Sequence, residues 1–163
     1  MAEIAIRPAQ ADDGEGLWAT LEPVIRDGLT YPVDPAASRA AVFAYWFAPD
    51  KRVFVAEQEG RIVGSYYLKP TSTGPASHVA NAGYIVHPQA RRMGVARAMA
   101  LDSFARAREA GYRAMQFNLV VSTNLAAIRL WRSVGMEVVG TLTEAFRVPD
   151  GQYVDALVMY RLL

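Results

Sequence analysis

Hydrophobic positions change their spacing several times along the chain, and each spacing predicts one kind of element. Short runs rich in β-branched and aromatic residues predict strands, whereas longer segments with apolar residues at helical spacing predict helices. The predicted strands cover residues 3–9, 52–58, 61–70, 78–86, 113–121, 137–148 and 153–162. The predicted helices cover residues 12–29, 38–47, 94–110 and 124–134. This order of elements predicts an α/β chain of the α+β type, in which helices pack on a mixed sheet.

Turn and capping residues mark the boundaries of these elements. Glu-Gly at 59–60 separates the strands of one expected hairpin, and Pro-Asp-Gly at 149–151 separates those of another. Ser38 is suited to cap the second helix. Pro23 falls inside the first predicted helix, and because proline lacks an N–H group we expect it to bend or split that helix.

The composition narrows the class of protein. The chain has 163 residues, of which 52% are hydrophobic, and no linker or repeat interrupts it, so we expect one domain over residues 1–163. Seventeen basic and sixteen acidic residues give a net charge of +1, and no basic run indicates a nucleic-acid partner. Cysteine is absent, which excludes disulfides, thiolate metal ligands and a cysteine nucleophile.

Two further features concern location and charge. The N-terminal segment lacks the features of a signal or transit peptide, and no apolar run is long enough to span a membrane. We therefore expect a cytoplasmic protein without a membrane partner or a metal. Basic charge is mostly arginine, and lysine occurs only at Lys51 and Lys69. We interpret this as a bias of composition and not as a sign of function.

The segment ARRMGVARA at residues 90–98 joins a short proline-containing loop to a predicted helix. The first N–H groups of a helix lack intrahelical partners, and with the helix dipole they bind anions such as a pyrophosphate. Small side chains at Gly94 and Ala96 leave the backbone open to such an anion. An ordinary strand-to-helix turn is the alternative, and the segment fits neither common nucleotide-binding glycine motif. Positive charge at the rim would come from Arg91, Arg92 and Arg97.

Two segments resemble motifs of the GNAT family of N-acyltransferases. VHPQARRMGVA resembles the family's acyl-CoA-binding motif, Arg/Gln-x-x-Gly-x-Gly/Ala after a strand, with Arg91, Gly94 and Ala96 in the matching places. STNLAAIRLWRSVGM resembles the second motif of the family, with Met136 in place of its aromatic residue. Two motifs in matching order on matching elements are more specific than either alone.

The resemblance implies the GNAT fold, a mixed and mostly antiparallel seven-stranded sheet with helices on both faces. Two central parallel strands, 79–86 and 113–121, would splay apart, and the pantetheine arm of acetyl-CoA would enter the gap and pair with the open strand edge. The resemblance also implies a homodimer, since many small members of the family pair. The residues that it implies for binding the co-substrate acetyl-CoA are Val86, Arg91, Arg92, Gly94, Val95, Ala96, Arg97 and Asn124.

The chain contains only three asparagines, Asn81, Asn118 and Asn124, and the first two fall inside predicted strands. Asparagine is disfavoured in strands, and a residue that breaks a local rule is a candidate for a functional site. The alternative for Asn81 and Asn118 is a hydrogen bond to nearby backbone. For Asn124 the alternative is a helix cap, which is the more ordinary role.

GSYYLKP, SHVANAGYIV and FNLVVSTNLAAIRLW more narrowly resemble yeast members of the family that acetylate proline analogues. This resemblance implies that Asn81 and Asn118 serve the acceptor and the chemistry, and that Asn124 helps to hold the cofactor. It also implies that the N–H groups of Asn118 and Leu119 bind a substrate carboxylate. Aromatic residues that we expect to line the acceptor pocket, with core packing as the alternative, are Tyr31, Trp46, Tyr66 and Tyr67.

The chemistry needs a proton acceptor, because only a neutral amine attacks a thioester. No Asp or Glu stands at the end of strand 79–86, so we expect an asparagine-held water to carry the proton to solvent. Many GNAT enzymes use a tyrosine to protonate the departing thiolate, but this chain has Trp131 there. A thiol with a pKa of about 8.5 still leaves readily near neutral pH. We expect surface or structural roles for His78 and His87.

These observations favour an acetyl-CoA-dependent N-acetyltransferase that acts on a small amine or amino-acid-like substrate. The narrower resemblance implies a cyclic imino acid such as azetidine-2-carboxylate, and hence a role in detoxification. A peptide or protein N-acetyltransferase is one alternative, and a non-catalytic acyl-CoA sensor is another. A pocket closed by the loop at 28–38 would favour the small molecule, whereas an open groove would favour the peptide.

Overall fold

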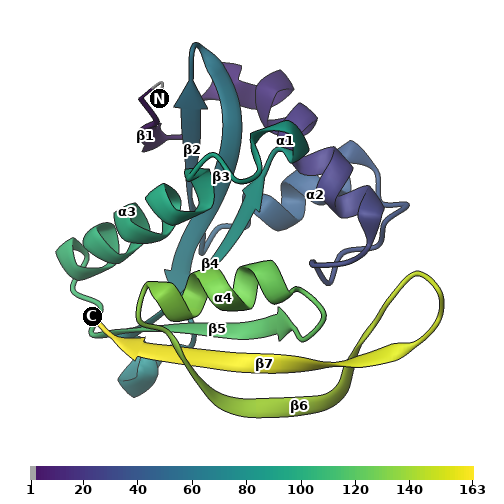
Figure 1. Ribbon diagram of the computed structural model, residues 1–163. Coiled ribbons are helices and arrows are strands. Elements are labelled where there is room, and N and C mark those ends of the chain that lie inside the picture. Colours follow the sequence, from purple (N-terminus) through teal and green to yellow (C-terminus); the bar gives the residue numbers. More distant parts are fainter. Residues whose placement is uncertain (1–2) are drawn as a thin grey trace.

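The computed structural model describes residues 3–163, which form the predicted series of helices and strands (Figure 1). The helices are α1 (Gly14–Asp27), α2 (Arg39–Trp46), α3 (Val95–Glu109) and α4 (Leu125–Ser133). The strands are β1 (Ala5–Pro8), β2 (Arg52–Gln58), β3 (Arg61–Pro70), β4 (Val79–Val86), β5 (Ala114–Val121), β6 (Glu137–Arg147) and β7 (Tyr153–Leu162). Short 3-10 turns lie at η1 (Ala11–Asp13), η2 (Gly74–Ala76) and η3 (Pro88–Ala90).

One mixed sheet joins all the strands in the order β1-β2-β3-β4-β5-β7-β6. Only β4 and β5 are parallel, and their pairing stops after Val79 with Ala114 and Ala80 with Met115. Beyond these two pairs the strands diverge, as their arrows show in Figure 1. The predicted seven-stranded sheet with two splayed parallel strands is therefore confirmed.

Helices cover both faces of this sheet, and each face has its own apolar core. On one face, Met99 and Phe104 of α3 pack in the same cluster as Tyr66, and Trp131 of α4 joins them. On the other face, α1 and α2 pack against alternate residues of the same strands, among them Tyr67. Successive side chains of a strand point to opposite faces, so neighbouring residues of β3 serve different cores.

The helix α1 runs without interruption through Pro23, so the expected split is wrong. Leu21 and Ile25 on either side of the proline are fully buried against the sheet. Tertiary packing of an apolar face contributes most of the stability of a helix in a protein, and here it compensates for the hydrogen bond that proline removes. The helix ends at Gly28, whose φ of 65° is left-handed.

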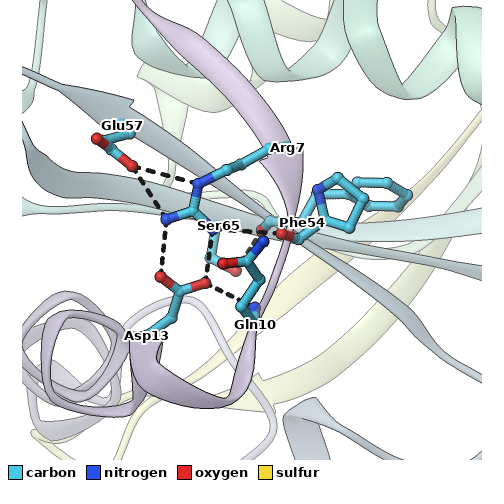
Figure 2. Close-up of polar contacts among 7 residues, drawn as sticks. Arg7, Gln10, Asp13, Phe54, Glu57 and Ser65 are labelled. Atoms are coloured by element: carbon cyan, nitrogen blue, oxygen red, sulfur yellow. Dashed lines mark hydrogen bonds and ion pairs between the residues drawn. The ribbon is translucent and has the colours of Figure 1, made fainter.

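A cluster of charged groups ties β1 to the start of α1 and to β2 (Figure 2). Arg7 donates two hydrogen bonds of 2.8 Å to the carboxylate of Asp13 and two, of 3.0 Å and 3.3 Å, to that of Glu57. The backbone N–H of Gln10 donates to the same Asp13 carboxylate at 2.7 Å. The hydrogen bonds from Arg7 lower the pKa of Asp13, which is 7% exposed. This cluster, Arg7, Gln10, Asp13 and Glu57, is called the β1 corner below.

Within residues 3–163, no helix has the length and apolar character needed to cross a membrane. In the same part of the chain, no three His, Cys, Asp or Glu side chains gather in a way that could hold a metal ion.

Candidate active site between β4 and β5

A cavity of about 510 Å³ opens where β4 and β5 diverge. Both strands, the loop after α1, and the first turns of α4 contribute to its walls. The residues predicted for the site that line this cavity are Tyr31, Tyr67, Asn81, Val86, Arg91, Asn118, Leu119 and Asn124. The fold therefore brings together residues from positions 31 to 124 of the sequence.

The glycine step before α3 comes three residues after Arg91, which lines the cavity, but Gly94 itself is not a lining residue. Gly94 is the N-cap of the helix, and its φ of 83° and ψ of −4° form a left-handed conformation that favours glycine. An added Cβ at Gly94 would meet no atom within 4 Å, so the backbone is open on that side of Gly94. This geometry suits an anion that needs close approach to the backbone.

Of the cofactor residues predicted around this step, Arg91 lines the cavity and the others do not. Arg92 and Arg97 are exposed, and Ala96 is partly buried in the first turn of α3. Val95 is 1% exposed because its side chain packs in the core against β3, so it offers only its backbone N–H to a ligand. Arg91 lines the cavity and lies 3.8 Å from Asp27 at the end of α1.

The amides of Asn81 and Asn118 are linked through Gln116. The Asn81 side chain donates to the Gln116 carbonyl at 2.9 Å, just beyond the last parallel pair of β4 and β5. The Gln116 side chain in turn donates to the Asn118 side-chain oxygen at 2.9 Å. Asn81 is 7% exposed, whereas Asn118 is exposed. Asn81 thus holds the diverging strands together, and Asn118 presents its amide to the open side.

A bulge in β5 explains how Asn118 and Leu119 reach the cavity. Phe117 pairs with Met159 of β7, but the next pair is Val120 with Leu157, so the register shifts between them. Bulges re-aim side chains and often occur next to active sites. Neither Asn118 nor Leu119 has a paired residue on β7.

Asn124 caps α4, because its side-chain oxygen accepts a hydrogen bond from the N–H of Ala127 at 3.2 Å. The helix cap that was the alternative role for Asn124 is therefore confirmed. The same residue lines the cavity, so a second role toward the cofactor stays a prediction.

Tyr31 fixes the loop after α1 over the cavity. Its hydroxyl donates to the carbonyl of Tyr84 on β4 at 3.0 Å, and burial raises the pKa of that hydroxyl. Gly83 permits this contact, because an added Cβ there would lie 2.7 Å from the Tyr31 oxygen and 2.6 Å from that of Tyr67. The ring of Tyr31 also packs edge-on against Trp46, with centroids 5.5 Å apart.

The expectation for the other aromatic residues is partly wrong. Tyr67 lines the cavity, but Trp46 and Tyr66 are not among its lining residues. Trp46 is fully buried and donates its ring N–H to Ser65 at 3.0 Å. Tyr66 faces α3, where its hydroxyl donates to Asp102 at 2.5 Å. Each therefore belongs to a core behind the cavity wall.

Both lysines of the chain line the cavity, which the sequence interpretation missed. The Lys51 ammonium donates to the Tyr45 carbonyl at 2.6 Å and lies 3.6 Å from the Tyr45 ring centroid. Lys69 forms an ion pair of 2.9 Å with Asp50. Burial lowers the pKa of Lys51 from 10.5 to about 8, with repulsion from Lys69 as the second cause. The signal in the sequence was their rarity.

Trp131 stands where the resemblance implies a tyrosine that protonates the departing thiolate. The indole lines the cavity and packs against Tyr84 and Phe117, with centroids 4.9 Å and 4.8 Å apart. The Tyr84 hydroxyl lies 2.6 Å from that of Ser103 on α3, and burial raises its pKa. Neither His78 nor His87 lines the cavity.

Comparison with known proteins identifies the family. Residues 18–136 match the Acetyltransferase (GNAT) family. The chain belongs to this family.

Individual relatives agree with this assignment. The N-acetyltransferase aca1 of Schizosaccharomyces pombe is 30% identical, over 82% of this chain and 72% of that protein. A GCN5-related N-acetyltransferase from Kribbella flavida is 36% identical, with a TM-score of 0.90 over 98% of both chains. The fold alone is shared with a phosphinothricin acetyltransferase from Sinorhizobium meliloti, solved with acetyl-CoA, at 21% identity and a TM-score of 0.86 over 98% of this chain and 88% of that one. As a GNAT member, the chain is an N-acetyltransferase that uses acetyl-CoA as its donor.

Proposed function

We propose that this enzyme acetylates the nitrogen of a small amine or amino-acid-like acceptor, such as the cyclic imino acid azetidine-2-carboxylate. The observation that carries the proposal is the cavity at the β4–β5 divergence, which is lined by Arg91 of the loop before α3 and has the amides of Asn81 and Asn118 in its wall. We also propose that the enzyme acts in the cytoplasm and that acetylation detoxifies such a substrate.

Acetyl-CoA binding is assigned to the side of the cavity next to α3. The first N–H groups of α3, with the open space at Gly94, would receive the pyrophosphate, and Arg91 would add charge. Arg92 and Arg97 would add charge from the rim. The edge of β4 near Val86, which β5 leaves unpaired, would hold the pantetheine arm, and Asn124 would contact the cofactor from α4.

In the reaction, one bond forms and one bond breaks at the thioester carbon. The neutral amine nitrogen attacks the thioester carbon, the carbon–sulfur bond breaks, and CoA leaves as a thiolate that takes a proton from solvent. The nitrogen loses its extra proton to a water held by the exposed amide of Asn118. Backbone N–H groups of β4 would stabilise the tetrahedral oxyanion, and holding the two reactants side by side supplies much of the rate.

The loop after α1, which encloses one side of the cavity, favours a small acceptor over a peptide. The Tyr31 hydroxyl ties the loop after α1 to β4, and Gly28 of the same loop touches the β6–β7 turn, where an added Cβ would lie 3.3 Å from Pro149. A second cavity of about 580 Å³ lies between this loop and the turn, and it shares Tyr31 and Pro32 with the first. We assign the second cavity to acceptor entry.

The test is release of free CoA thiol with a panel of acceptors. The panel holds imino acids, amino acids, simple amines and short peptides, each at equal concentration with acetyl-CoA. Fastest release with a small amino-acid-like acceptor, and the acetylated product by mass spectrometry, are expected. Faster release with the peptides would replace this proposal by peptide N-acetylation.

We further propose that residues 1–163 fold as one domain and pair as a homodimer. The strand β6 is at the edge of the sheet and, with β7, exposes Val139, Leu142 and Tyr153, which are 60%, 44% and 59% accessible. Exposed apolar edge strands favour pairing with another copy. Sedimentation that shows only an 18-kDa species at micromolar concentration would contradict the dimer.

A further inference from the structure

The charged residues that line the main cavity are all cations. They are Arg91, Lys51 and Lys69, and no Asp or Glu belongs to the lining among residues 3–163. Arg91 stands with Val86 at the end next to α3, the part assigned to acetyl-CoA. The two lysines stand at the end of the cavity formed by α2, β2 and β3, where nothing proposed so far uses their charge.

The sheet register places the lysines side by side. Arg52 pairs with Leu68, so the next residues outward, Lys51 and Lys69, oppose each other. A bulge between Ala56 and Glu57 produces this register. Directly opposed residues of an antiparallel pair point to the same face, and on this face the rings of Tyr45 and Tyr67 form the surroundings.

Like charges side by side in a partly buried site are unfavourable unless something compensates for them. Asp50 pairs with Lys69, but it leaves one positive charge in excess. Among residues 3–163, Lys51 has no carboxylate within ion-pair distance, and its nitrogen contacts a carbonyl and two ring faces. The ring faces favour an ammonium ion but do not neutralise it.

A further polar group of the same cavity is unsatisfied. The hydroxyl oxygen of Thr30, in the loop after α1, is buried and has no hydrogen-bond partner among residues 3–163. Thr30 lines the cavity together with the lysines. Buried polar groups normally have partners, so an unpartnered hydroxyl in a cavity wall is consistent with one that a ligand supplies.

We propose that Lys51 and Lys69 form an anion subsite that binds a carboxylate of the acceptor, so that the enzyme selects amines which carry an acid group. This inference rests on the proposed function and names its substrate class. The N–H groups of Asn118 and Leu119, on another strand, offer neutral donors to the acceptor, whereas the lysines add charge. If the lysines bind the carboxylate, lysine variants lose the preference for acids. If the N–H groups of Asn118 and Leu119 alone bind it, lysine variants keep that preference.

The experiment compares each amino or imino acid with its neutral carboxamide, for example azetidine-2-carboxylate with azetidine-2-carboxamide. The measured quantity is the ratio of kcat/KM for the acid to that for the amide. Differences in amine basicity cancel when this ratio is compared between wild type and variants. Wild type is expected to prefer the acids, and Lys51→Met and Lys69→Met are each expected to lower the ratio about tenfold, as loss of a hydrogen bond to a charged group does.

Two controls separate the subsite from general effects. Arg52→Met removes an exposed positive charge from the neighbouring residue, which points to the other face, and is expected to leave the ratio unchanged. Lys69→Arg keeps the charge and is expected to retain most of the preference. Affinity for acetyl-CoA, measured by calorimetry, should be the same in all these variants.

The outcomes distinguish failure of the anion subsite from failure of the proposed function. An unchanged ratio in both lysine variants, or equal rates with acids and amides in wild type, overturns the anion subsite while the proposed N-acetylation stands. Acetylation of no amine in the panel overturns the proposed function, and the subsite with it.

Discussion

The β1 corner and the β4–β5 cavity both concentrate charged and polar side chains, but they treat them in opposite ways. In the corner, Arg7 faces two carboxylates at 3.0 Å or less, and the groups close on one another (Figure 2). In the cavity, Lys51 and Lys69 have one carboxylate between them. In the corner each charged group has an opposite charge within 3.0 Å, whereas in the cavity Lys51 has no carboxylate partner among residues 3–163.

This difference assigns separate roles to the two regions. A satisfied network fixes its elements in place, and removing one member leaves the others unpaired, which costs folding stability. An unsatisfied set gains its partners only when a ligand binds. Variants in the corner should therefore lose stability and keep normal turnover, whereas variants in the cavity should lose activity or acceptor selectivity without losing much stability.

The largest effect is expected for Asn118→Ala. Its exposed side chain makes one hydrogen bond, from Gln116, so the substitution should change the free energy of unfolding little. If the amide holds the amine or its proton-carrying water, kcat should fall on the order of 10²-fold. Steady-state kinetics and urea unfolding on one preparation measure both quantities.

Ser38→Ala is the matched control, because Ser38 caps α2 through the N–H of Ala41 at 3.2 Å and lies outside the cavity. It should lose about 1 kcal/mol of stability and keep normal turnover. Near-normal turnover in a destabilised Asn118 variant would instead show that this asparagine is structural.

The next effect concerns the start of α3. Gly94→Trp should weaken acetyl-CoA binding about tenfold or more, because an indole would fill the open space in front of the helix N–H groups. Gly111, at the other end of α3, has a similar φ of 85° and the same open surroundings. Gly111→Trp therefore carries the same backbone strain without blocking the anion. Equal affinities of the two variants by calorimetry would remove the pyrophosphate assignment.

The part of the site that the sequence predicted rests on local features. The helix start at Gly94 and the asparagines Asn81 and Asn118 were found because a glycine step and a polar residue in a strand are visible in a few consecutive residues. Their gathering followed from the implied order of strands. The folded structure was needed to show that Asn81 is buried against Gln116 while Asn118 is exposed.

The lysine pair was missed for a geometric reason. Extending the hairpin outward from Gln58 paired with Arg61 places Lys51 opposite Leu68, and thus on the face opposite to Lys69. The bulge after Ala56 shifts the register by one residue, which reverses this result. No local sequence pattern in β2 predicts the bulge. The sequence therefore predicts neither the pairing of the lysines nor their shared cavity. Pro23 shows the same limit, because the buried residues around it keep α1 continuous where the local rule allows a split.

A smaller effect is expected for Asp13→Asn in the β1 corner. The variant keeps the shape of the side chain but removes the charge that Arg7 contacts, so the free energy of unfolding should fall by about 1–3 kcal/mol. Because the folded-state pKa of Asp13 is lowered below 3.8, its contribution is present above that pH and is lost as pH falls through the folded pKa. The stability difference from wild type should therefore shrink on acidification below pH 4, and kcat/KM at pH 7 should be unchanged. Lower turnover per folded molecule would contradict the separation of roles.

The smallest effect is the pH dependence of stability in Lys51→Met, and its sign is opposite to that of Asp13. The pKa of Lys51 is about 8 in the folded chain and 10.5 when unperturbed, so between these values the unfolded chain holds more protons. Stability then rises with pH, because the cost of a buried ammonium is fully present below about pH 8 and disappears toward 10.5.

The methionine variant lacks this cost at every pH. Its stability relative to wild type should therefore be most favourable near pH 7 and should decline steadily between pH 8 and 10. The groups around Lys51 that also titrate or carry charge are Lys69, Asp50, Tyr45 and Tyr67. A parallel series on Lys69→Met separates the contribution of the nearest of these. If the stability difference between Lys51→Met and wild type stays constant across this range, Lys51 keeps its ordinary pKa. Its charge then does not destabilise the folded chain, and a bound carboxylate would have no such cost to relieve.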